Sequence, residues 1–234
     1  MRLKVTSSEA PIANASWPEL EAPLATQLQL GCDELKLFPG AVQRQQLMDY
    51  LALFSKWNKA YNLTSIRDGT QMVTRHLLDS LAIAPFLTGR RFIDVGTGAG
   101  LPGVPLAIMC PDREFHLLDS NGKKARFLFQ VKTALGLDNI AVHQARVESF
   151  LAAEPYDAVL SRAFASLQDM VHGCRHLLAP DGCFLAMKGA LPTEELASVY
   201  SDFPESAVYP LRVPGLNEQR HLVVIAQQQG IRQS

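Results

Sequence analysis

The sequence has few cysteines, no surplus of charge and no apolar run long enough to cross a membrane. None of its four cysteines forms a pair at C-x-x-C spacing, which is typical of buried thiols in a reducing compartment. The formal net charge of −1 excludes a strongly basic nucleic-acid binder, so contact with RNA must depend on a local patch. The first 25 residues hold no apolar signal segment, and we therefore expect a cytoplasmic protein.

Apolar residues make up 47% of the 234 residues, enough for a sizeable core, and their periodicity changes along the chain. Before Gly89 the pattern predicts helices over 24–35, 41–61 and 72–87. After it, the predicted strands cover 91–95, 115–119, 140–143, 157–160, 183–187, 207–213 and 221–226. The helices between them cover 101–110, 123–135, 167–178 and 194–200, the first with a late start because Pro105 lies inside it.

Alternating strands and helices are typical of a doubly wound, mostly parallel α/β sheet. The loop between the last two predicted strands, 214–220, is too short for a parallel crossover, so these strands must pair antiparallel. A Rossmann-like sheet with this ending is typical of class I methyltransferases that use S-adenosylmethionine (SAM). We therefore expect such a SAM-binding domain over 89–228, a helical region over 28–88, and flexible tails at 1–27 and 229–234.

The first predicted strand runs into a glycine-rich loop, DVGTGAGLPG, from Asp94 to Gly103. Glycines permit a sharp turn and a close approach to a ligand, and the next helix presents free N–H groups at its N-terminus. In a SAM site these groups face the methionyl carboxylate, and the loop curls under the ribose. We expect Gly96, Gly98 and Gly100 to bind the cofactor.

The same loop also contains the dinucleotide pattern G-x-G-x-x-G, at Gly98, Gly100 and Gly103. Asp119 ends the next predicted strand and suits either ligand, because both carry a ribose diol. Three features favour SAM: Asp94 precedes the first glycine by two residues, Glu148 follows the third strand near the expected adenine position, and no Tyr-x-x-x-Lys pair is present.

Other motifs are more specific than the loop. They are Lys56-Trp57-Asn58 with Tyr61-Asn62-Leu63-Thr64, Arg75-His76-Leu77-Leu78-Asp79-Ser80-Leu81, Leu117-Leu118-Asp119-Ser120 with Lys123-Lys124, Arg146-Val147-Glu148, Ser161-Arg162-Ala163-Phe164, Lys188-Gly189 and Arg220-His221-Leu222-Val223. With the glycine loop, this ordered set resembles the RsmG (GidB) family, bacterial methyltransferases acting on guanine N7 of 16S ribosomal RNA. The resemblance runs from Leu47 to Ile225 and departs mildly at Lys124, where the family often has arginine.

The resemblance implies a SAM site and an RNA acceptor. It implies that SAM contacts Gly96, Leu101, Asp119, Val147, Glu148 and Arg162. The chain lacks the Asn/Asp-Pro-Pro-Tyr motif of many amino-methylating enzymes, and Ser161-Arg162-Ala163-Phe164 occupies its place after the fourth predicted strand. Guanine N7 carries no proton, so the expected catalytic groups are donors to the neighbouring O6. Arg162, Lys188 and Asn62 are the candidates, and Asp79 is a possible acceptor near the cationic product.

Each candidate has a structural alternative. Arg162 and Lys188 both follow strands at the ligand-binding edge, but each also suits a structural ion pair. Asn62 also suits the end of a helix. A buried hydrogen bond between His76 and Asp79, three residues apart, explains that pair as well as substrate contact does.

Two further patterns favour surface roles. His172 and His176 have the i, i+4 spacing of a metal pair, but no third ligand accompanies them, and we expect a solvated face and no metal. A basic helix face formed by Lys123, Lys124, Arg126 and Lys132 suits either solvent or RNA phosphate.

Three functions remain open at the level of the sequence. The first is guanine-N7 methylation of 16S rRNA, with either the RNA or the small-subunit particle as substrate. For this function we expect a monomer that does not contact the membrane. The second is a SAM-dependent methyltransferase for another acceptor. The third is a non-catalytic SAM-binding assembly protein.

Overall fold

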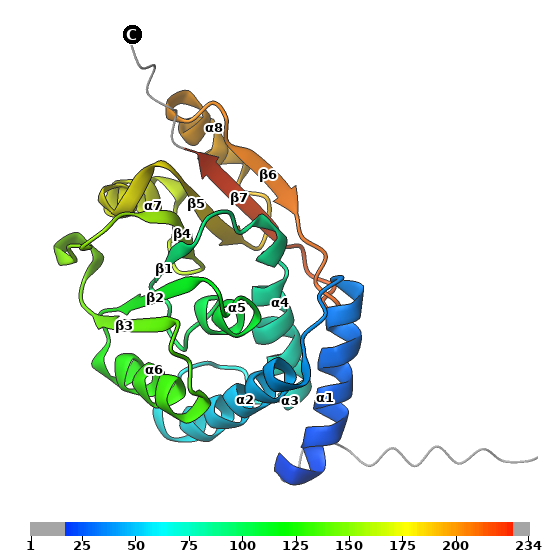
Figure 1. Cartoon of the computed structure of the whole chain (residues 1–234). Coiled ribbons are helices and arrows are strands. Elements are labelled where there is room, and N and C mark those ends of the chain that lie inside the picture. Colours follow the sequence, from blue (N-terminus) through cyan, green and yellow to red (C-terminus); the bar gives the residue numbers. More distant parts are fainter. Residues whose placement is uncertain (1–16, 227–234) are drawn as a thin grey trace, which may run out of the picture.

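The computed structural model describes residues 17–226, and a seven-stranded sheet is its central element (Figure 1). The strand order is β3-β2-β1-β4-β5-β7-β6. The first five strands in this order are parallel, and β7 is antiparallel to both β5 and β6. Their bounds are β1 Arg91–Val95, β2 Glu114–Asp119, β3 Ile140–Gln144, β4 Tyr156–Ser161, β5 Leu178–Lys188, β6 Ala207–Pro210 and β7 His221–Ala226. The expected Rossmann-like sheet with an antiparallel ending is confirmed.

The region before the sheet is helical, but its details differ from the prediction. Helix α1 covers Trp17–Glu34, so residues 17–27 are helical although we expected a flexible tail there. Helix α2, Ala41–Tyr61, has the predicted bounds. The predicted helix over 72–87 is instead a series of short pieces, α3 Gly69–Met72, a π-helix Val73–Leu78, α4 Asp79–Leu81 and a 3₁₀ turn Ala84–Phe86. Residues 1–16 and 227–234 lie outside the described residues.

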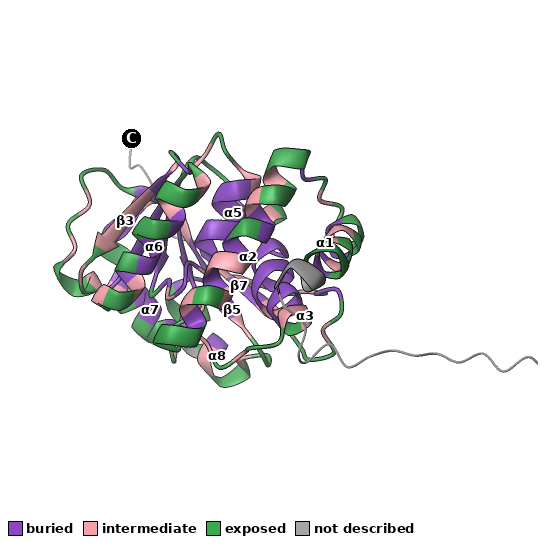
Figure 2. Ribbon diagram, turned by 90° about the horizontal axis from the view of Figure 1, so that it is seen from below, coloured by how far each residue is buried: buried purple, intermediate pink, exposed green. Residues whose placement is uncertain are grey.

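The helices cover the sheet in layers. Helices α5 (Gly103–Met109) and α6 (Gly122–Leu135) pack against the sheet, and α2 packs on both of them from outside. Helices α7 (Leu167–Cys174) and α8 (Thr193–Asp202) contact each other and, with β5, share the second of two hydrophobic cores. Figure 2 shows buried ribbon gathered in the middle and exposed turns around it.

The ends of α6 follow the local sequence. The Asn121 side chain accepts a hydrogen bond from the Lys123 backbone N–H at 2.9 Å, which caps the first turn. Gly136 ends the helix with φ of +63°, a left-handed conformation that glycine adopts without a Cβ clash. This helix therefore begins where β2 ends, at the carboxyl edge of the sheet.

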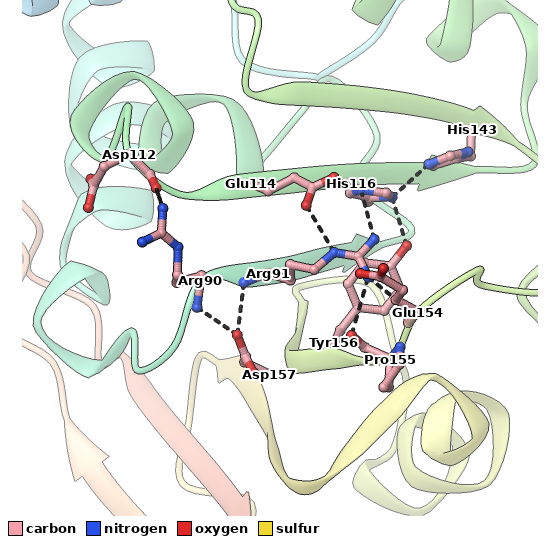
Figure 3. Close-up of polar contacts among 10 residues, drawn as sticks. All are labelled: Arg90, Arg91, Asp112, Glu114, His116, His143, Glu154, Pro155, Tyr156 and Asp157. Carbon is pink, nitrogen blue, oxygen red and sulfur yellow. Dashed lines mark hydrogen bonds and ion pairs between the residues drawn. The ribbon is translucent and has the colours of Figure 1, made fainter.

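A polar network joins the amino-terminal halves of strands β1, β2 and β4 and includes His143 near the end of β3 (Figure 3). The Arg91 guanidinium donates to Glu114 at 2.9 Å and lies over the ring of Tyr156. His116 lies 2.6 Å from Glu114, 2.9 Å from His143 and 2.7 Å from the Tyr156 hydroxyl. These contacts satisfy the hydrogen-bonding groups of side chains next to the second core, to which Tyr156 belongs. Because they link neighbouring strands, they stabilise the sheet on the side away from the glycine loop.

The cysteines and helix lengths bear on two sequence expectations. All four cysteines are free, and burial raises the pKa of Cys32 to about 11 and of Cys174 to about 12. Thiols with such pKa values are inert at neutral pH.

Among the described helices, none is long and apolar enough to span a bilayer.

Candidate cofactor and acceptor site

A cavity of about 320 Å³ opens at the carboxyl edge of the sheet, where parallel α/β proteins bind ligands. Its lining includes four of the residues expected to bind SAM, namely Gly96, Asp119, Val147 and Glu148. The remaining lining residues are Val95, Leu118, Ser120, Lys124, Ala145, Arg146, Ala163 and Phe164. The volume falls within the range of small-molecule sites.

The glycine loop is shaped by contacts that leave no room for larger residues. A Cβ on Gly96, whose φ is +69°, would lie 2.6 Å from the Cβ of Ala163, so only glycine lets the loop approach the end of β4. Asp94 holds both ends of the loop, because its Oδ2 accepts from the Thr97 hydroxyl at 2.7 Å and from the Gly103 N–H at 2.8 Å. Burial raises the pKa of Asp94 to about 6.

The far side of the loop is anchored to the helical region. The buried Tyr50 hydroxyl, on α2, donates to the Ala99 carbonyl at 2.7 Å. A Cβ on Gly100 would collide with Val104, and Leu101 packs partly buried against the larger core. Gly100 and Leu101, both expected to contact SAM, are thus outside the cavity lining, as is Gly98. Gly98 nevertheless donates its N–H to Asp119 at 2.9 Å, which ties the loop to the lining.

Asp119 lies where a ribose diol would need an acceptor. It is 7% exposed and lines the cavity at the end of β2. Its Oδ2 accepts from the Gly98 N–H at 2.9 Å and from the Lys124 ammonium at 3.4 Å, and its Oδ1 accepts from the Asn121 N–H at 2.8 Å. A carboxylate has about four acceptor positions, so one remains on Oδ1 and the long Lys124 contact is replaceable.

Arg162, expected to contact SAM and the acceptor, takes part in a buried charge cluster with Asp79 and Arg220. Asp79 is 2% exposed; its Oδ2 lies 3.3 Å from Nη1 of Arg162, and its Oδ1 accepts from Nε of Arg220 at 3.0 Å. The two arginines come from the ends of the sheet, and Asp79 comes from α4. This cluster joins the helical region to the sheet, and it commits Asp79 to arginine instead of to a cationic product.

The suggested hydrogen bond between His76 and Asp79 is wrong. Within the described residues, neither ring nitrogen of His76 has a hydrogen-bond partner, although the residue is only 5% exposed. Its ring packs on Phe54 with centroids 5.2 Å apart. Burial, with the nearby Arg162 charge as a second cause, lowers the pKa of His76 to about 4. His76 lies in the π-helix, a form found often at functional sites and not visible in the sequence pattern.

His76 should make folding stability depend on pH. The unfolded histidine binds a proton near pH 6.5 and the folded one only near pH 4, so its contribution is complete above pH 6.5 and is lost as the pH falls towards 4. Replacing His76→Phe, which keeps an aromatic ring, should flatten this dependence by on the order of 3 kcal/mol. Urea unfolding at several pH values measures it. Burial also raises the pKa of Asp94, but Asp94 is present in both proteins and affects both equally. If the plots of unfolding free energy against pH are parallel for the two proteins, His76 is not the group responsible.

Lys188, expected to face the acceptor, is engaged with the protein. Its ammonium donates to the carbonyls of Phe164 and Ala165 at 3.4 and 3.2 Å and pairs with Glu195 at 3.1 Å. The side chain is 14% exposed. Lys188 therefore fixes the segment after β4 that lines the cavity, which corresponds to the structural alternative for this residue.

Asn62 also matches its structural alternative. It ends α2 with a left-handed φ of +49°, its N–H donates to the Asn58 carbonyl at 3.1 Å, and its Oδ1 accepts from Arg67 at 2.9 Å. Asn58, one turn earlier, has a role that sequence reasoning missed. Its buried amide bonds Thr64 N–H and the Ile66 carbonyl, and so holds the loop that follows the helix.

Two expectations about surface side chains hold in part. His172 and His176 are both exposed, as expected, but α7 ends at Cys174, and His176 lies in the next 3₁₀ turn, 3.2 Å from the Phe150 carbonyl. Lys132 donates to the Ile140 carbonyl and Lys124 to Asp119, so only Lys123 and Arg126 of the predicted basic face point outward. Across residues 17–226 no cluster of three or more histidine, cysteine or acidic residues is arranged to hold a metal.

A larger groove, of about 690 Å³, lies at the amino edge of the sheet beside the network of Figure 3. Arg90, Arg91, Asp112, Glu114 and Asp157 are among its lining residues. Most of these charges already bind one another or the backbone, as where Asp157 accepts from the N–H groups of Arg90 and Arg91. We therefore place the functional site at the smaller cavity, beside the glycine loop.

Comparisons with known proteins identify the family of the chain. The family model for GidB, rRNA small subunit methyltransferase G, matches residues 43–223. The chain belongs to this family. A relative from Shewanella loihica named Ribosomal RNA small subunit methyltransferase G is 54% identical over 200 residues, 86% of this chain and 97% of the relative. One of the same name from Erwinia tasmaniensis is 58% identical over 184 residues, 79% of this chain and 90% of the relative.

Solved structures support the fold. A SAM dependent methyltransferase from Aquifex aeolicus matches with a TM-score of 0.51 and 14% identity, covering 67% of this chain and 93% of that one. A precorrin-6y C5,15-methyltransferase from Geobacter metallireducens matches with a TM-score of 0.50 and 13% identity, covering 71% and 92%. The GidB-family chain is thus a SAM-dependent methyltransferase with a class I fold, which removes the dinucleotide reading of the glycine loop.

Proposed function

We propose that the chain transfers the methyl group of SAM to N7 of a guanine in 16S ribosomal RNA. The observation that carries this proposal is the cavity at the carboxyl edge, lined by Gly96, Asp119 and Glu148 in a chain of the GidB family. SAM supplies an electrophilic methyl group on its sulfonium. In this proposal Asp119 binds the ribose, and Val147 and Glu148 bind the adenine.

Guanine N7 suits a site in which both lining carboxylates, Asp119 and Glu148, are assigned to the cofactor. N7 has an in-plane lone pair and no proton to remove, so transfer depends on alignment of the two reactants. Alignment alone can lower a barrier by about 7–11 kcal/mol. The residues of this chain would therefore serve to bind and orient, with Arg162 nearest the junction of the cofactor and the base.

The three proposed catalytic residues differ in their contacts. Arg162 keeps a direct role in this proposal, because its side chain is 28% exposed and Ala163, the next residue, lines the cavity, although its Nη1 is buried and pairs with Asp79. Lys188 supports the Phe164 segment, which lines the cavity, whereas Asn62 ends α2 and binds Arg67. We propose that these two act on the acceptor by positioning backbone rather than by touching the base.

The pH dependence of methyl transfer tests the choice of N7. With SAM saturating, single-turnover rates should stay nearly level between about pH 6.5 and 9, because no base must lose a proton. Over the same range the Arg162→Lys variant should be slower at every pH, since lysine lacks the planar fork of guanidinium. A wild-type rate that climbs about tenfold per pH unit would mean that the acceptor carries a proton, and N7 would be rejected.

The acceptor itself is identified by mapping methylated bases in small-subunit rRNA from cells with and without the gene. Purified protein should restore one guanine-N7 methyl group on deproteinised 16S rRNA or on the small-subunit particle, and comparison of the two distinguishes the substrates. Restoration elsewhere would favour a different acceptor, and SAM binding without any transfer would favour a non-catalytic assembly protein.

Sedimentation of the purified protein tests whether it is a monomer, as we propose. Imaging of the protein in cells tests whether it lies in the cytoplasm.

A further inference from the structure

The basic residues of this nearly neutral chain are unevenly distributed. Residues 50–67 and 120–137 together contain seven of the 22 lysines and arginines and none of the 23 acidic residues. The rest of the chain therefore carries 15 basic residues against 23 acidic ones. A local concentration of one charge in a molecule of the opposite net sign favours a partner of complementary charge.

The fold brings these two segments together. Most of the first segment lies in α2 and most of the second in α6, and the two helices pack side by side (Figure 1). Gln46 donates to the Leu135 carbonyl at 2.9 Å, whereas Trp57 contacts Phe127 at 5.5 Å between centroids. The helices are thus antiparallel, and the end of α2 lies beside the start of α6.

Four cations on this surface have no carboxylate partner. Lys56 and Lys59 on α2, and Lys123 and Arg126 on α6, are exposed. Within residues 17–226 none of the four takes part in an ion pair, and Arg126 donates only to a carbonyl of its own helix. Unpaired surface cations remain free to bind phosphate.

An aromatic ring is exposed among these cations. Tyr61, the last residue of α2, is 46% exposed and packs on Trp57 with ring centroids 5.0 Å apart. Trp57 packs in turn on the buried Phe127, so the tyrosine ring has a rigid backing. A supported ring with a solvent-exposed surface is a stacking platform for a nucleic-acid base.

The surface also adjoins the SAM cavity. Lys124 lines the cavity, and Lys123 precedes it in the first turn of α6. We propose that the basic–aromatic surface formed by Lys56, Lys59, Tyr61, Lys123 and Arg126 binds single-stranded RNA. One base stacks on Tyr61 while the four cations bind phosphates. The inference rests on the proposed function, because it supplies the RNA contact that methylation at this cavity requires.

The pattern favours RNA over an acidic protein segment. Aspartate and glutamate side chains would use the four cations but would leave the tyrosine ring in water. A single strand uses both, since its phosphates bind cations and every base has a face that stacks. The two partners therefore predict different effects for replacement of the ring and of the charges.

The test uses the full chain, deproteinised 16S rRNA and a salt titration. Neutralising Lys56→Gln with Lys123→Gln should reduce the slope of log affinity against log salt by about 1.4, since each single-strand phosphate contact contributes about 0.7. The matched control neutralises Lys36→Gln with Arg90→Gln, which are exposed residues before α2 and at the amino edge of the sheet. The control should keep the wild-type slope.

The aromatic contact has its own pair of variants. Tyr61→Ala should weaken RNA binding roughly 5- to 150-fold, whereas Tyr61→Phe, which keeps the ring, should bind as the wild type does. SAM affinity should be unchanged in all of these variants, because none of the substituted residues lines the cavity, and it also reports correct folding.

Three outcomes overturn the proposal. The first is wild-type protein that fails to bind deproteinised rRNA at about 50 mM salt, where phosphate contacts are strong. The second is a salt slope in the Lys56 and Lys123 variant equal to that of the control. The third is that the variants bind the small-subunit particle more weakly but bind deproteinised rRNA as the wild type does. That result would assign the surface to a ribosomal protein. Methyl transfer by the wild-type protein is scored separately, so a failure of the proposed function is distinguished from a failure of this surface.

Discussion

Replacing Asp79→Ala should lower the free energy of unfolding by about 3–5 kcal/mol. The carboxylate is 2% exposed and contacts both Arg162 and Arg220, so its removal leaves two guanidinium groups with reduced compensation in a poorly hydrated place. The loss should be global, because the cluster joins α4 to the ends of β4 and β7. Urea denaturation of both proteins at pH 7 measures it.

The control for Asp79 is an exposed ion pair of the same chemistry. Glu154 pairs with Arg91 at 3.2 Å with a side chain that is 75% exposed, and Glu154→Ala should cost at most about 0.5 kcal/mol. Asp79→Asn, which keeps the size and one acceptor oxygen, should fall between the two. Equal midpoints for the Asp79 and Glu154 alanine variants would show that the buried cluster contributes no more than a surface pair.

Asp119→Ala should weaken SAM binding roughly 10- to 150-fold. Charge-assisted hydrogen bonds of the kind a carboxylate makes to a ribose diol contribute about 1.5–3 kcal/mol. SAM affinity should fall further because the glycine loop is less well held. Gly98 and Asn121 donate their N–H groups to this carboxylate and would lose their acceptor. Isothermal calorimetry with SAM and with S-adenosylhomocysteine measures both affinities.

Asp138→Ala provides the matched control for Asp119, since it removes an exposed carboxylate between α6 and β3, away from the cavity lining. Its SAM affinity should equal that of the wild type, which separates local contact from the change in net charge. Asp119→Ala should lower the thermal midpoint, because Gly98 and Asn121 lose their acceptor, but the variant should still be folded at the temperature of the titration. If SAM binds the variant with unchanged affinity, the ribose does not use this residue.

Local sequence determined the elements that carry the cofactor site. The alternation of strands and helices, the short loop before the last strand and the glycine-rich segment were sufficient for the sheet, its antiparallel ending and the place of the cavity. Strands β1 and β7 and helix α2 have the predicted bounds, because their apolar periodicity is strong and their ends carry clear turn signals. Asp119, the last residue of β2, and Glu148, which follows β3, both line the cavity, in line with their place at the carboxyl edge of the predicted sheet.

The order of the last strands depends on pairing across the sheet. The sequence predicted that β6 and β7 pair antiparallel, and they do, but β7 inserts between β5 and β6. Likewise, α1 begins at Trp17 despite Pro23 inside it, because its apolar residues Leu24 and Leu28 are buried in the larger core. Tertiary burial overrides a local signal of this kind.

The partners of the charged side chains were decided by the tertiary structure alone. Asp79 and Arg220 are 141 residues apart yet share a hydrogen bond, and Lys188 reaches carbonyls 23 and 24 residues earlier. No periodicity encodes such contacts, because they depend on how separate elements meet in space. Sequence alone therefore determined the family, the fold and the cofactor edge. Only packing decided that Asp79 binds arginine, that the buried ring nitrogens of His76 have no hydrogen-bond partner among the described residues, and that α2 and α6 lie side by side.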